Sequence, residues 1–284
     1  MQGRKNPIGT INGLLIVDKP GEWTSHDVCH FIRKKFSIPK VGHAGILDRT
    51  ATGVLVVLLG AYTKLSARFL NETKEYQGVM ELGAKTSTHD AAGEVLQKSS
   101  WQHVDDAAVR AMVESFKGEQ EQLPPMASAV KLGGVRLYKL ARQGKEIDRP
   151  RKTIHIYDLV IRRIELPHVE FFCRVSKGTY VRTLANDIGE ALGTHGFLKE
   201  LRRTASGGFK IEDSIRVDFL KSLKDQENLK PFLRHLPQVE STPSAEILNR
   251  QGTALRAPTC PGTGALCASA TPSGPRKVPR TEIA

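Results

Sequence analysis

Apolar and polar positions divide most of the chain into short strand-like and helix-like segments. Residues 13–17 and 54–59 are continuous apolar runs rich in branched side chains, which is typical of buried strands. Residues 75–82 mostly alternate between polar and apolar side chains, and this period of two predicts a strand with one buried face. Residues 153–166 and 169–175 are also strand-like, so strands recur along the chain.

Helical spacing of apolar residues appears between the strands. Val28, Phe31, Ile32 and Phe36 follow such a spacing, after a Thr24-Ser25-His26-Asp27 string that resembles a capping box. Three other stretches favour helices: residues 65–70, residues 108–116 behind a cap at Asp105 or Asp106 and ended by Gly118, and residues 181–192 ended by Gly193.

The strands and helices are intermingled without a regular β-α-β rhythm. We therefore predict an α+β fold in which helices flank a mixed, largely antiparallel sheet. This domain is expected to occupy residues 11–236 and to contain an irregular insertion over residues 123–151. The insertion includes Pro124-Pro125 and Gly133-Gly134, and the second of these dipeptides is typical of a hairpin turn.

The composition changes near residue 243. From there the chain is rich in Pro, Gly, Ala, Ser and Thr, and it has no aromatic residue. Such a segment buries too little apolar surface to offset the entropy lost on ordering the chain. We therefore expect residues 245–284 to form a short, poorly structured tail that is mostly disordered.

With 284 residues, 39% of them hydrophobic and 25% charged, the chain has the composition of a globular protein. No run approaches the roughly 18 apolar residues that span a bilayer, so we expect a cytoplasmic protein without membrane contact. Free thiols are expected rather than a structural zinc site, because the cysteines form no C-x-x-C pair and no histidines cluster beside them. They are Cys29, Cys173, Cys260 and Cys267.

A formal net charge of +12 favours a polyanionic partner, with nucleic acid as the leading candidate. A generally basic surface without a specific partner is the alternative. The distribution of charge favours the partner, because basic residues gather in the insertion and directly after it and predict a phosphate-contacting face. They are Lys131, Arg136, Lys139, Arg142, Lys145, Arg149, Arg151 and Lys152, against only Glu146 and Asp148.

The most specific string runs from Gly42 to Gly53 and reads GHAGILDRTATG. It places one carboxylate, Asp48, in a glycine-rich loop ahead of a predicted strand, where small residues let a ligand approach the backbone. A lone Asp in a loop is more often a turn former or a helix cap. The whole string therefore carries the signal rather than Asp48 alone.

Four other segments accompany this string. They are GLLIVDKP at residues 13–20, KEY at 74–76, a block from PMASAVK to ARQG at 125–144, and SKGTYVRTL with DIG at 176–189. Together the five segments resemble, in order and spacing, the motifs of the TruB-like tRNA pseudouridine synthases. The resemblance covers roughly residues 11–215.

The resemblance implies that the protein is an isomerase that converts the T-loop uridine at tRNA position 55 to pseudouridine. In this reaction the uracil leaves C1′ of its ribose, turns, and is rejoined through C5 without any redox change. No cofactor or metal is implied. The implied partner is the T-arm of tRNA, and a monomer is expected.

The resemblance also implies three catalytic residues. Asp48 is the catalytic carboxylate, which either attacks the ribose or assists glycosidic cleavage. An ordinary Asp has a pKa of about 3.9, so we expect this group to be anionic at neutral pH. Arg182 is implied as the cation that holds it. Tyr76 is implied to stack on the uracil and is a candidate to take the C5 proton, although a phenol with a pKa near 10 favours stacking.

Six residues are implied in substrate binding: His43, Lys19, Tyr180, Leu201, Lys131 and Arg142. His43 would fill the space that a uridine leaves when it turns out of the RNA stack. Lys19 shapes the adjacent turn, whereas Tyr180 and Leu201 match pocket-wall positions and also suit ordinary core packing. The two cations of the insertion would contact phosphates as this segment closes over the RNA.

Two features depart from the family's pattern. Arg49 follows the carboxylate where proline is common, so the loop lacks a ring that fixes φ. We expect this cation, next to Asp48, to favour the anion. Many members also end in a small PUA-like RNA-binding domain, whereas residues 245–255 resemble at most its beginning. We therefore expect that domain to be truncated or absent over 245–284, as a shifted reading frame would produce.

Three other interpretations compete. A non-catalytic RNA-binding or tRNA-chaperone protein on the same scaffold would have lost Asp48, Tyr76 or Arg182, and all three are present. A guide-RNA-dependent synthase of a multiprotein particle is disfavoured by the short, incomplete C-terminus. A basic nucleotide hydrolase of another fold would need a catalytic diad or a metal-ligand set, and the sequence suggests neither.

Overall fold

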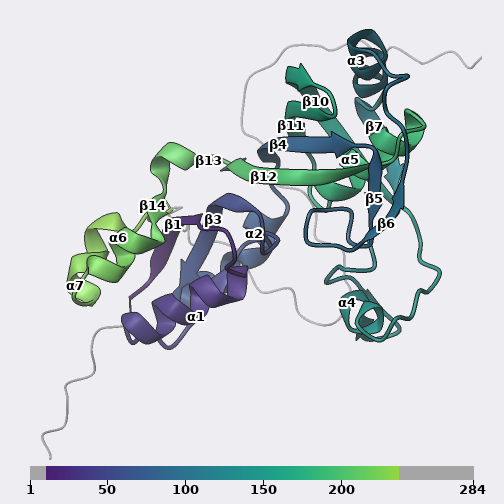
Figure 1. The fold of residues 1–284 in the computed structure, drawn as a ribbon. Coiled ribbons are helices and arrows are strands. Elements are labelled where there is room, and N and C mark those ends of the chain that lie inside the picture. The colour runs from purple at the N-terminus through teal and green to yellow at the C-terminus, as the bar shows by residue number, and fades with distance from the viewer. Residues whose placement is uncertain (1–10, 237–284) are drawn as a thin grey trace, which may run out of the picture. The chain divides into compact units, whose positions relative to one another are not determined.

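A computed structural model of the chain describes residues 11–236. The tail predicted over 245–284, with Cys260 and Cys267, lies outside the described residues. A ten-stranded sheet forms the centre of the described part (Figure 1). Its strands follow the order β14-β1-β3-β12-β4-β11-β10-β7, with β2 paired to β3 and β13 paired to β12.

The strands of this sheet have the following bounds: β1 Gly13–Lys19, β2 Val41–His43, β3 Thr52–Leu59, β4 Lys74–Leu82, β7 Gly118–Gln122, β10 Lys152–Glu165, β11 His168–Val175, β12 Gly196–Ser206, β13 Phe209–Lys210 and β14 Ile215–Arg216. Two small hairpins stand apart from it: β5 (Ala84–Thr86) with β6 (Val95–Lys98), and β8 (Lys131–Leu132) with β9 (Val135–Arg136).

The helices are α1 Ser25–Lys35, α2 Ser66–Leu70, α3 Asp106–Ser115, α4 Leu137–Ala141, α5 Val181–Ala191, α6 Val217–Ser222 and α7 Gln226–Leu229. Three 3₁₀ turns accompany them: η1 Gly60–Leu65, η2 Ile211–Asp213 and η3 Lys230–Phe232. Within residues 11–236, no helix has the length and apolar character needed to cross a membrane.

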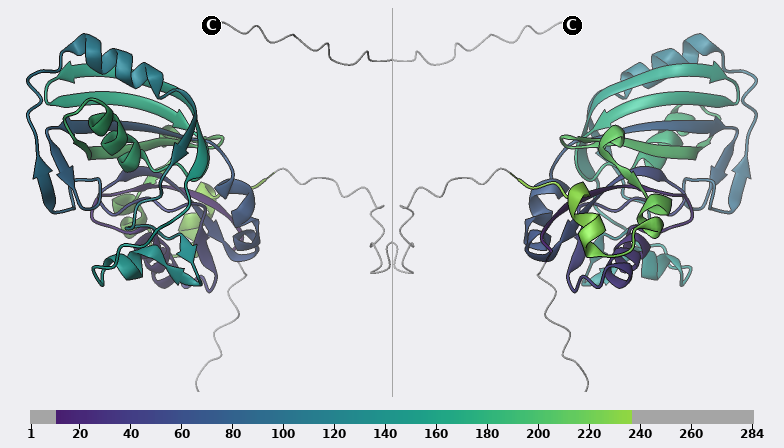
Figure 2. Two further views of the ribbon diagram at one scale, coloured as in Figure 1. Left: turned by 90° about the vertical axis from the view of Figure 1, so that its right-hand side faces the viewer. Right: turned by 90° about the vertical axis from the view of Figure 1, so that its left-hand side faces the viewer.

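Most neighbouring strands of the ten-stranded sheet run antiparallel. Among the described pairs, only β1 with β14 and β3 with β12 are parallel. Helices flank the sheet. Both views in Figure 2 show α3 lying over β10. The prediction of an α+β fold with a mixed, largely antiparallel sheet is therefore confirmed for the described residues.

Three apolar clusters surround the sheet. One packs α1, α6 and α7 against one face of β1 and β3, and a second covers the other face of the same two strands. The third packs α3 and α5 against β4, β10, β11 and β12. The loop over residues 44–51, the Asp48 loop, joins these regions. Ala44 belongs to the second cluster, whereas Leu47 and Ala51 belong to the third, so the loop carries Asp48 to their junction.

Several local sequence signals are confirmed. Helix α1 begins after Thr24, whose hydroxyl accepts a hydrogen bond from the Asp27 N–H at 3.1 Å. The Asp27 carboxylate accepts in return from the Thr24 N–H at 2.8 Å, which completes the predicted capping box. Strand β4 buries alternate side chains from Lys74 to Leu82, as its period of two predicts.

Polar segments were predicted less well. The expectation that Gly118 ends a helix is wrong, because α3 ends at Ser115 and Gly118, at φ +93°, begins β7. Strands β7 and β12 lack a clear alternation and were not predicted. They are strands because β7 pairs with β10 and because β12 lies between β3 and β4. The insertion holds the hairpin predicted at Gly133-Gly134, but also α4.

A glycine in α5 allows this helix to lie directly against the start of β12. A Cβ at Gly189 would lie 2.4 Å from the Gly196 nitrogen, so the helix would have to shift. We expect Gly189→Ala to lower the free energy of unfolding by about 1–3 kcal/mol in urea titrations. Gly208→Ala is the control, because a Cβ there meets nothing within 4 Å. An equal loss in both variants would contradict this account.

Candidate active site

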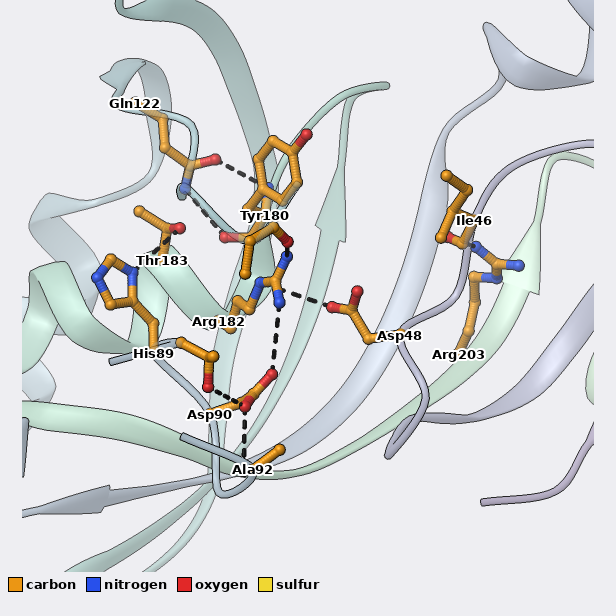
Figure 3. A network of polar contacts seen from close by, with 12 residues as sticks. Ile46, Asp48, His89, Asp90, Ala92, Gln122, Tyr180, Arg182, Thr183 and Arg203 are labelled. Carbon is orange, nitrogen blue, oxygen red and sulfur yellow. Dashed lines mark hydrogen bonds and ion pairs between the residues drawn. The ribbon is translucent and has the colours of Figure 1, made fainter. Parts of the chain in front are cut away.

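Asp48 lies in the loop that leads into β3, at the junction of the apolar clusters (Figure 3). Its side chain is 36% exposed, and its Oδ2 lies 3.6 Å from Nε of Arg182. Burial raises the pKa of the Asp48 carboxyl, and the positive charge of Arg182 opposes that rise. Its pKa therefore lies above the ordinary Asp value assumed from the sequence, and Arg182 favours the charged form.

Arg182 is the second residue of α5, and its side chain is only 6% exposed. A buried guanidinium needs acceptors around it. Its Nη2 donates to the Ala127 carbonyl of the insertion at 2.7 Å, and its Nη1 lies 3.5 Å from Oδ2 of Asp90. The guanidinium also lies over the ring of Tyr180, 5.8 Å from its centroid. Arg182 therefore joins the Asp48 loop, the β5–β6 connection and the insertion.

Asp90 is held by its own turn. Its Oδ1 accepts from the Thr88 hydroxyl at 2.5 Å and from the Ala92 N–H at 3.1 Å, which leaves Oδ2 for Arg182. The neighbouring His89 has a φ of +63°, and its Nδ1 lies 3.4 Å from the Thr183 hydroxyl. The turn thus fixes the Asp90 carboxylate next to the Arg182 guanidinium.

Tyr180 precedes α5 and forms one wall of the site (Figure 3). Its N–H donates to Oε1 of Gln122 at 2.8 Å, and its carbonyl accepts from Nε2 of the same side chain at 3.0 Å. Burial raises the pKa of the Tyr180 phenol. The ring is thereby held in place at the end of β7, with a neutral hydroxyl.

Tyr76 occupies the middle of the sheet on β4, where its side chain is 8% exposed. It is opposite Arg203 of β12 and Cys173 of β11. Burial raises the pKa of the Tyr76 phenol, and the charge of Arg203 opposes the rise. Leu201, half-buried on β12, packs against the same apolar cluster. These side chains form the apolar floor beside Asp48.

Lys19, at the end of β1, is completely buried. Its ammonium donates to the carbonyls of Pro20 at 2.9 Å, Trp23 at 2.6 Å and Arg49 at 3.2 Å. Burial lowers the pKa of Lys19 to about 8, although the Asp48 charge opposes this. An ammonium has three donors, and in Lys19 all three bond to backbone carbonyls. Lys19 therefore anchors the turn beside the Asp48 loop.

His43 and Arg49 lie on either side of Asp48 along the chain. His43 belongs to β2, is half-buried, and has its pKa lowered by burial. Arg49 turns away from the carboxylate: its Nε lies 3.2 Å from Oε2 of Glu22, and its side chain is 67% exposed. The expectation that Arg49 supplies charge to Asp48 is therefore wrong, because Arg182, Lys19 and Arg203 supply it.

Lys131 and Arg142 belong to a separate surface of the insertion. Lys131 lies in β8 and Arg142 directly follows α4, and both side chains are exposed. The Arg142 guanidinium lies over the Tyr138 ring at 5.6 Å. Figure 1 shows α4 well away from the ten-stranded sheet. The insertion therefore contributes to the site through the Ala127 carbonyl and displays Lys131 and Arg142 on an exposed surface.

Four residues of the site were not singled out from the sequence: Ser25, His89, Asp90 and Arg203. Asp90 falls in a polar loop, Ser25 in a helix cap, and Arg203 in a segment without alternation, so no local pattern distinguishes them. Their roles arise from long-range contacts. Among the described residues, no group of three or more His, Cys, Asp or Glu is placed to hold a metal ion.

The sequence matches known families over most of its length. Residues 33–181 match the TruB family pseudouridylate synthase N-terminal domain, and residues 182–239 match the tRNA pseudouridylate synthase B C-terminal domain. Three curated proteins named tRNA pseudouridine synthase B are similar to this chain. The protein of Geobacter sulfurreducens is 45% identical over 223 residues, with 78% of this chain and 73% of the relative covered.

The second, from Geotalea uraniireducens, is 50% identical, with 73% of this chain and 67% of the relative covered. The third, from Opitutus terrae, is 42% identical, with 84% of this chain and 98% of the relative covered. A chain in the crystal structure of a Cbf5–Nop10–Gar1 complex is 31% identical with a TM-score of 0.60, and 78% of this chain and 59% of that chain are covered. A chain of an H/ACA RNP bound to a substrate RNA is 29% identical with a TM-score of 0.55, and 72% of this chain and 51% of that chain are covered.

The half-buried histidine beside Asp90 predicts a pH dependence of stability. Burial, with the charges of Arg182 and Lys85, lowers the pKa of His89 to about 4 from an ordinary 6.5. The unfolded chain therefore binds a proton that the folded chain does not as pH falls from about 6.5 to about 4, so stability falls over that window. Urea unfolding at pH 7 and pH 5 measures the loss.

We expect His89→Asn to show a smaller loss between the two pH values, since Asn tolerates the left-handed backbone at this position. His30→Asn, on the surface of α1, is the comparison variant and should keep the wild-type pH dependence. An unchanged pH dependence in His89→Asn would show that other groups are responsible.

Proposed function

The chain belongs to the TruB family of tRNA pseudouridine synthases, and we propose that it converts the T-loop uridine at tRNA position 55 to pseudouridine at Asp48. Membership makes the protein an isomerase that forms pseudouridine in tRNA. The observation that supports the assignment of the site is the approach of Asp48 to the buried guanidinium of Arg182.

The geometry of this pair suits a reacting carboxylate. The two nearest atoms are 3.6 Å apart, and Arg182 Nε makes no hydrogen bond in the described structure. The guanidinium therefore favours the anion without fully occupying its oxygens, while Asp90 and Ala127 hold the other end of Arg182. We infer that Asp48 acts at C1′ of the ribose, where the bond to N1 breaks and the bond to C5 forms.

Tyr76 is proposed to pack against the uracil. Its phenol is buried and its pKa is raised, so the hydroxyl stays neutral at physiological pH and is a weak base. Stacking of an aromatic ring on a base is worth about 1–3 kcal/mol. With Tyr180 and Leu201 as further walls, the side chains around Asp48 offer an apolar surface for a base turned out of its helix.

We further propose that the T-arm of tRNA binds across the Asp48 loop and the insertion. His43, half-buried in β2 beside the loop, would take the place of the displaced uridine. Lys131 and Arg142 would contact phosphates. The protein would act in the cytoplasm as a monomer and without a cofactor. Identities of 42–50% to the tRNA enzymes, against 29–31% to the particle-associated chains, support the standalone type.

Replacing the carboxylate tests the assignment of Asp48. We expect Asp48→Asn, which keeps the shape of the side chain, to reduce tritium release from tRNA labelled at uracil C5 by at least about 10³-fold. Asp158→Asn is the control, because that carboxylate pairs with Arg174 on the exposed side of β10 and should leave the rate unchanged. Sequencing the product RNA identifies the modified uridine.

Wild-type release from Asp48→Asn would remove Asp48 from the mechanism. No release from the wild-type protein, together with tight tRNA binding, would favour a non-catalytic RNA-binding protein.

Salt dependence tests the proposed role of the insertion. Each phosphate contact contributes about 0.7–0.9 to the slope of log affinity against log salt concentration. We expect tRNA affinity to fall steeply with salt, and Lys131→Gln with Arg142→Gln to reduce the slope. Lys221→Gln with Lys230→Gln removes equal charge from α6 and η3 and should not alter it. A flat dependence in the wild type would contradict phosphate contact.

A further inference from the structure

Side chains from outside the Asp48 loop hold the peptide groups next to Asp48. Ser25, the first residue of α1, is 3% exposed. Its hydroxyl accepts a hydrogen bond from the Leu47 N–H at 2.9 Å and donates to the Leu47 carbonyl at 3.3 Å. One side chain therefore satisfies both polar groups of the residue that precedes Asp48, and it does so from a rigid helix end.

Arg203 approaches the same stretch from β12. It is 1% exposed, and it is among the largest fully buried side chains of the described residues. Its Nη1 donates to the Ile46 carbonyl at 3.4 Å, and its Nε donates to the Val54 carbonyl at 2.7 Å. The guanidinium thus links the backbone before Asp48 to the strand after it (Figure 3).

The strand that carries Arg203 also fixes the end of the loop and the floor of the site. In the register of the sheet, Arg203 is opposite Gly53 on one side and Tyr76 on the other. Gly53 has a φ of +104°, and a Cβ there would lie 2.2 Å from the Arg203 carbonyl oxygen. This close approach sets the distance between β3 and β12. Arg203 therefore lies between the end of the Asp48 loop and the strand that carries Tyr76.

After Asp48 the loop is held by Lys19 at the Arg49 carbonyl, whereas the residue types of the loop do little to restrict its backbone. Gly45 has a φ of +101°, and Arg49 lacks the ring that would restrict its own backbone. The side chain of Ile46 is 58% exposed and does not anchor the loop. The side chain of Leu47 is buried, but apolar packing is less directional than hydrogen bonds to a carbonyl and an amide.

We propose that Ser25 and Arg203 are positioning residues that hold the backbone before Asp48 and thereby aim its carboxylate at the ribose. This inference rests on the proposed function of Asp48. Neither side chain needs to touch the RNA. A displacement of about 1 Å in a reacting group can slow a reaction about 10²-fold, so loss of either contact has a kinetic consequence.

The test compares Ser25→Ala, Arg203→Lys and the double variant by single-turnover tritium release from C5-labelled tRNA. We expect each single change to slow release by about 10- to 100-fold while the Kd for tRNA changes by less than about twofold. Because both residues restrain the same backbone, the double variant should lose less than the product of the single losses. Hydrogen exchange of a peptide covering residues 44–53 should be faster in each variant.

Gln226→Leu is the matched control for stability. Gln226 is also buried and also donates to two carbonyls, those of Phe36 and Ser37, which lie at the opposite end of α1 from Ser25. It should lower the Tm and leave the rate of tritium release and the exchange of residues 44–53 unchanged. Ser25→Ala removes a single atom, so it tests the inference even if Arg203→Lys fails to fold.

Wild-type release rates in the folded Ser25→Ala and Arg203→Lys proteins would overturn the inference, as would an equal loss of rate in Gln226→Leu. Unchanged exchange of residues 44–53 in both variants would overturn it as well. A wild-type protein that releases no tritium would contradict the proposed function instead, and the exchange measurement would still decide whether the two side chains restrain the loop.

Discussion

The burial of the Arg182 guanidinium is the constraint on which the rest of the site depends. A charge removed from water must be surrounded by acceptors, and breaking such a pair costs about 3–5 kcal/mol. The acceptors come from segments distant in sequence: Asp48, Asp90 and the Ala127 carbonyl. The Asp48 loop, a turn and the insertion are consequently gathered around the start of α5. The same charge favours the anionic form of the Asp48 carboxylate, so one interaction contributes both to packing and to the electrostatics of the proposed site.

The sheet supplies the second requirement, which is a fixed distance between its two halves. Strand β12 runs between β3 and β4, parallel to the first and antiparallel to the second. The Asp48 loop crosses the same seam, with Ala44 packed on one side and Leu47 on the other. Because both the loop and the strand span the seam, the backbone fixes the position of Asp48 relative to Tyr76.

The sequence predicted those features that are encoded locally. Continuous apolar runs located β1 and β3, alternation of polar and apolar residues located β4, and the capping box located the start of α1. Motif resemblance singled out Asp48 and Arg182, which the structure places together. Strands β7 and β12 were missed because pairing partners rather than side-chain alternation make them strands. Asp90 and Arg203 were missed for a related reason, since their environment is assembled from residues far away in the chain. The expectation that Arg49 acts on Asp48 was wrong because the Arg49 side chain pairs with Glu22 instead.

Three buried side chains hold the Asp48 loop by donating hydrogen bonds to its main-chain carbonyls. Lys19 donates to Arg49, Ser25 to Leu47, and Arg203 to Ile46. Main-chain acceptors are the same whatever side chain a residue carries. The exposed side chains of Ile46 and Arg49 take no part in these three contacts. The loop therefore combines exposed side chains with a backbone that buried side chains hold. Under the proposed function, substitutions at these two positions would alter the surface offered to the RNA while keeping the backbone contacts beside Asp48.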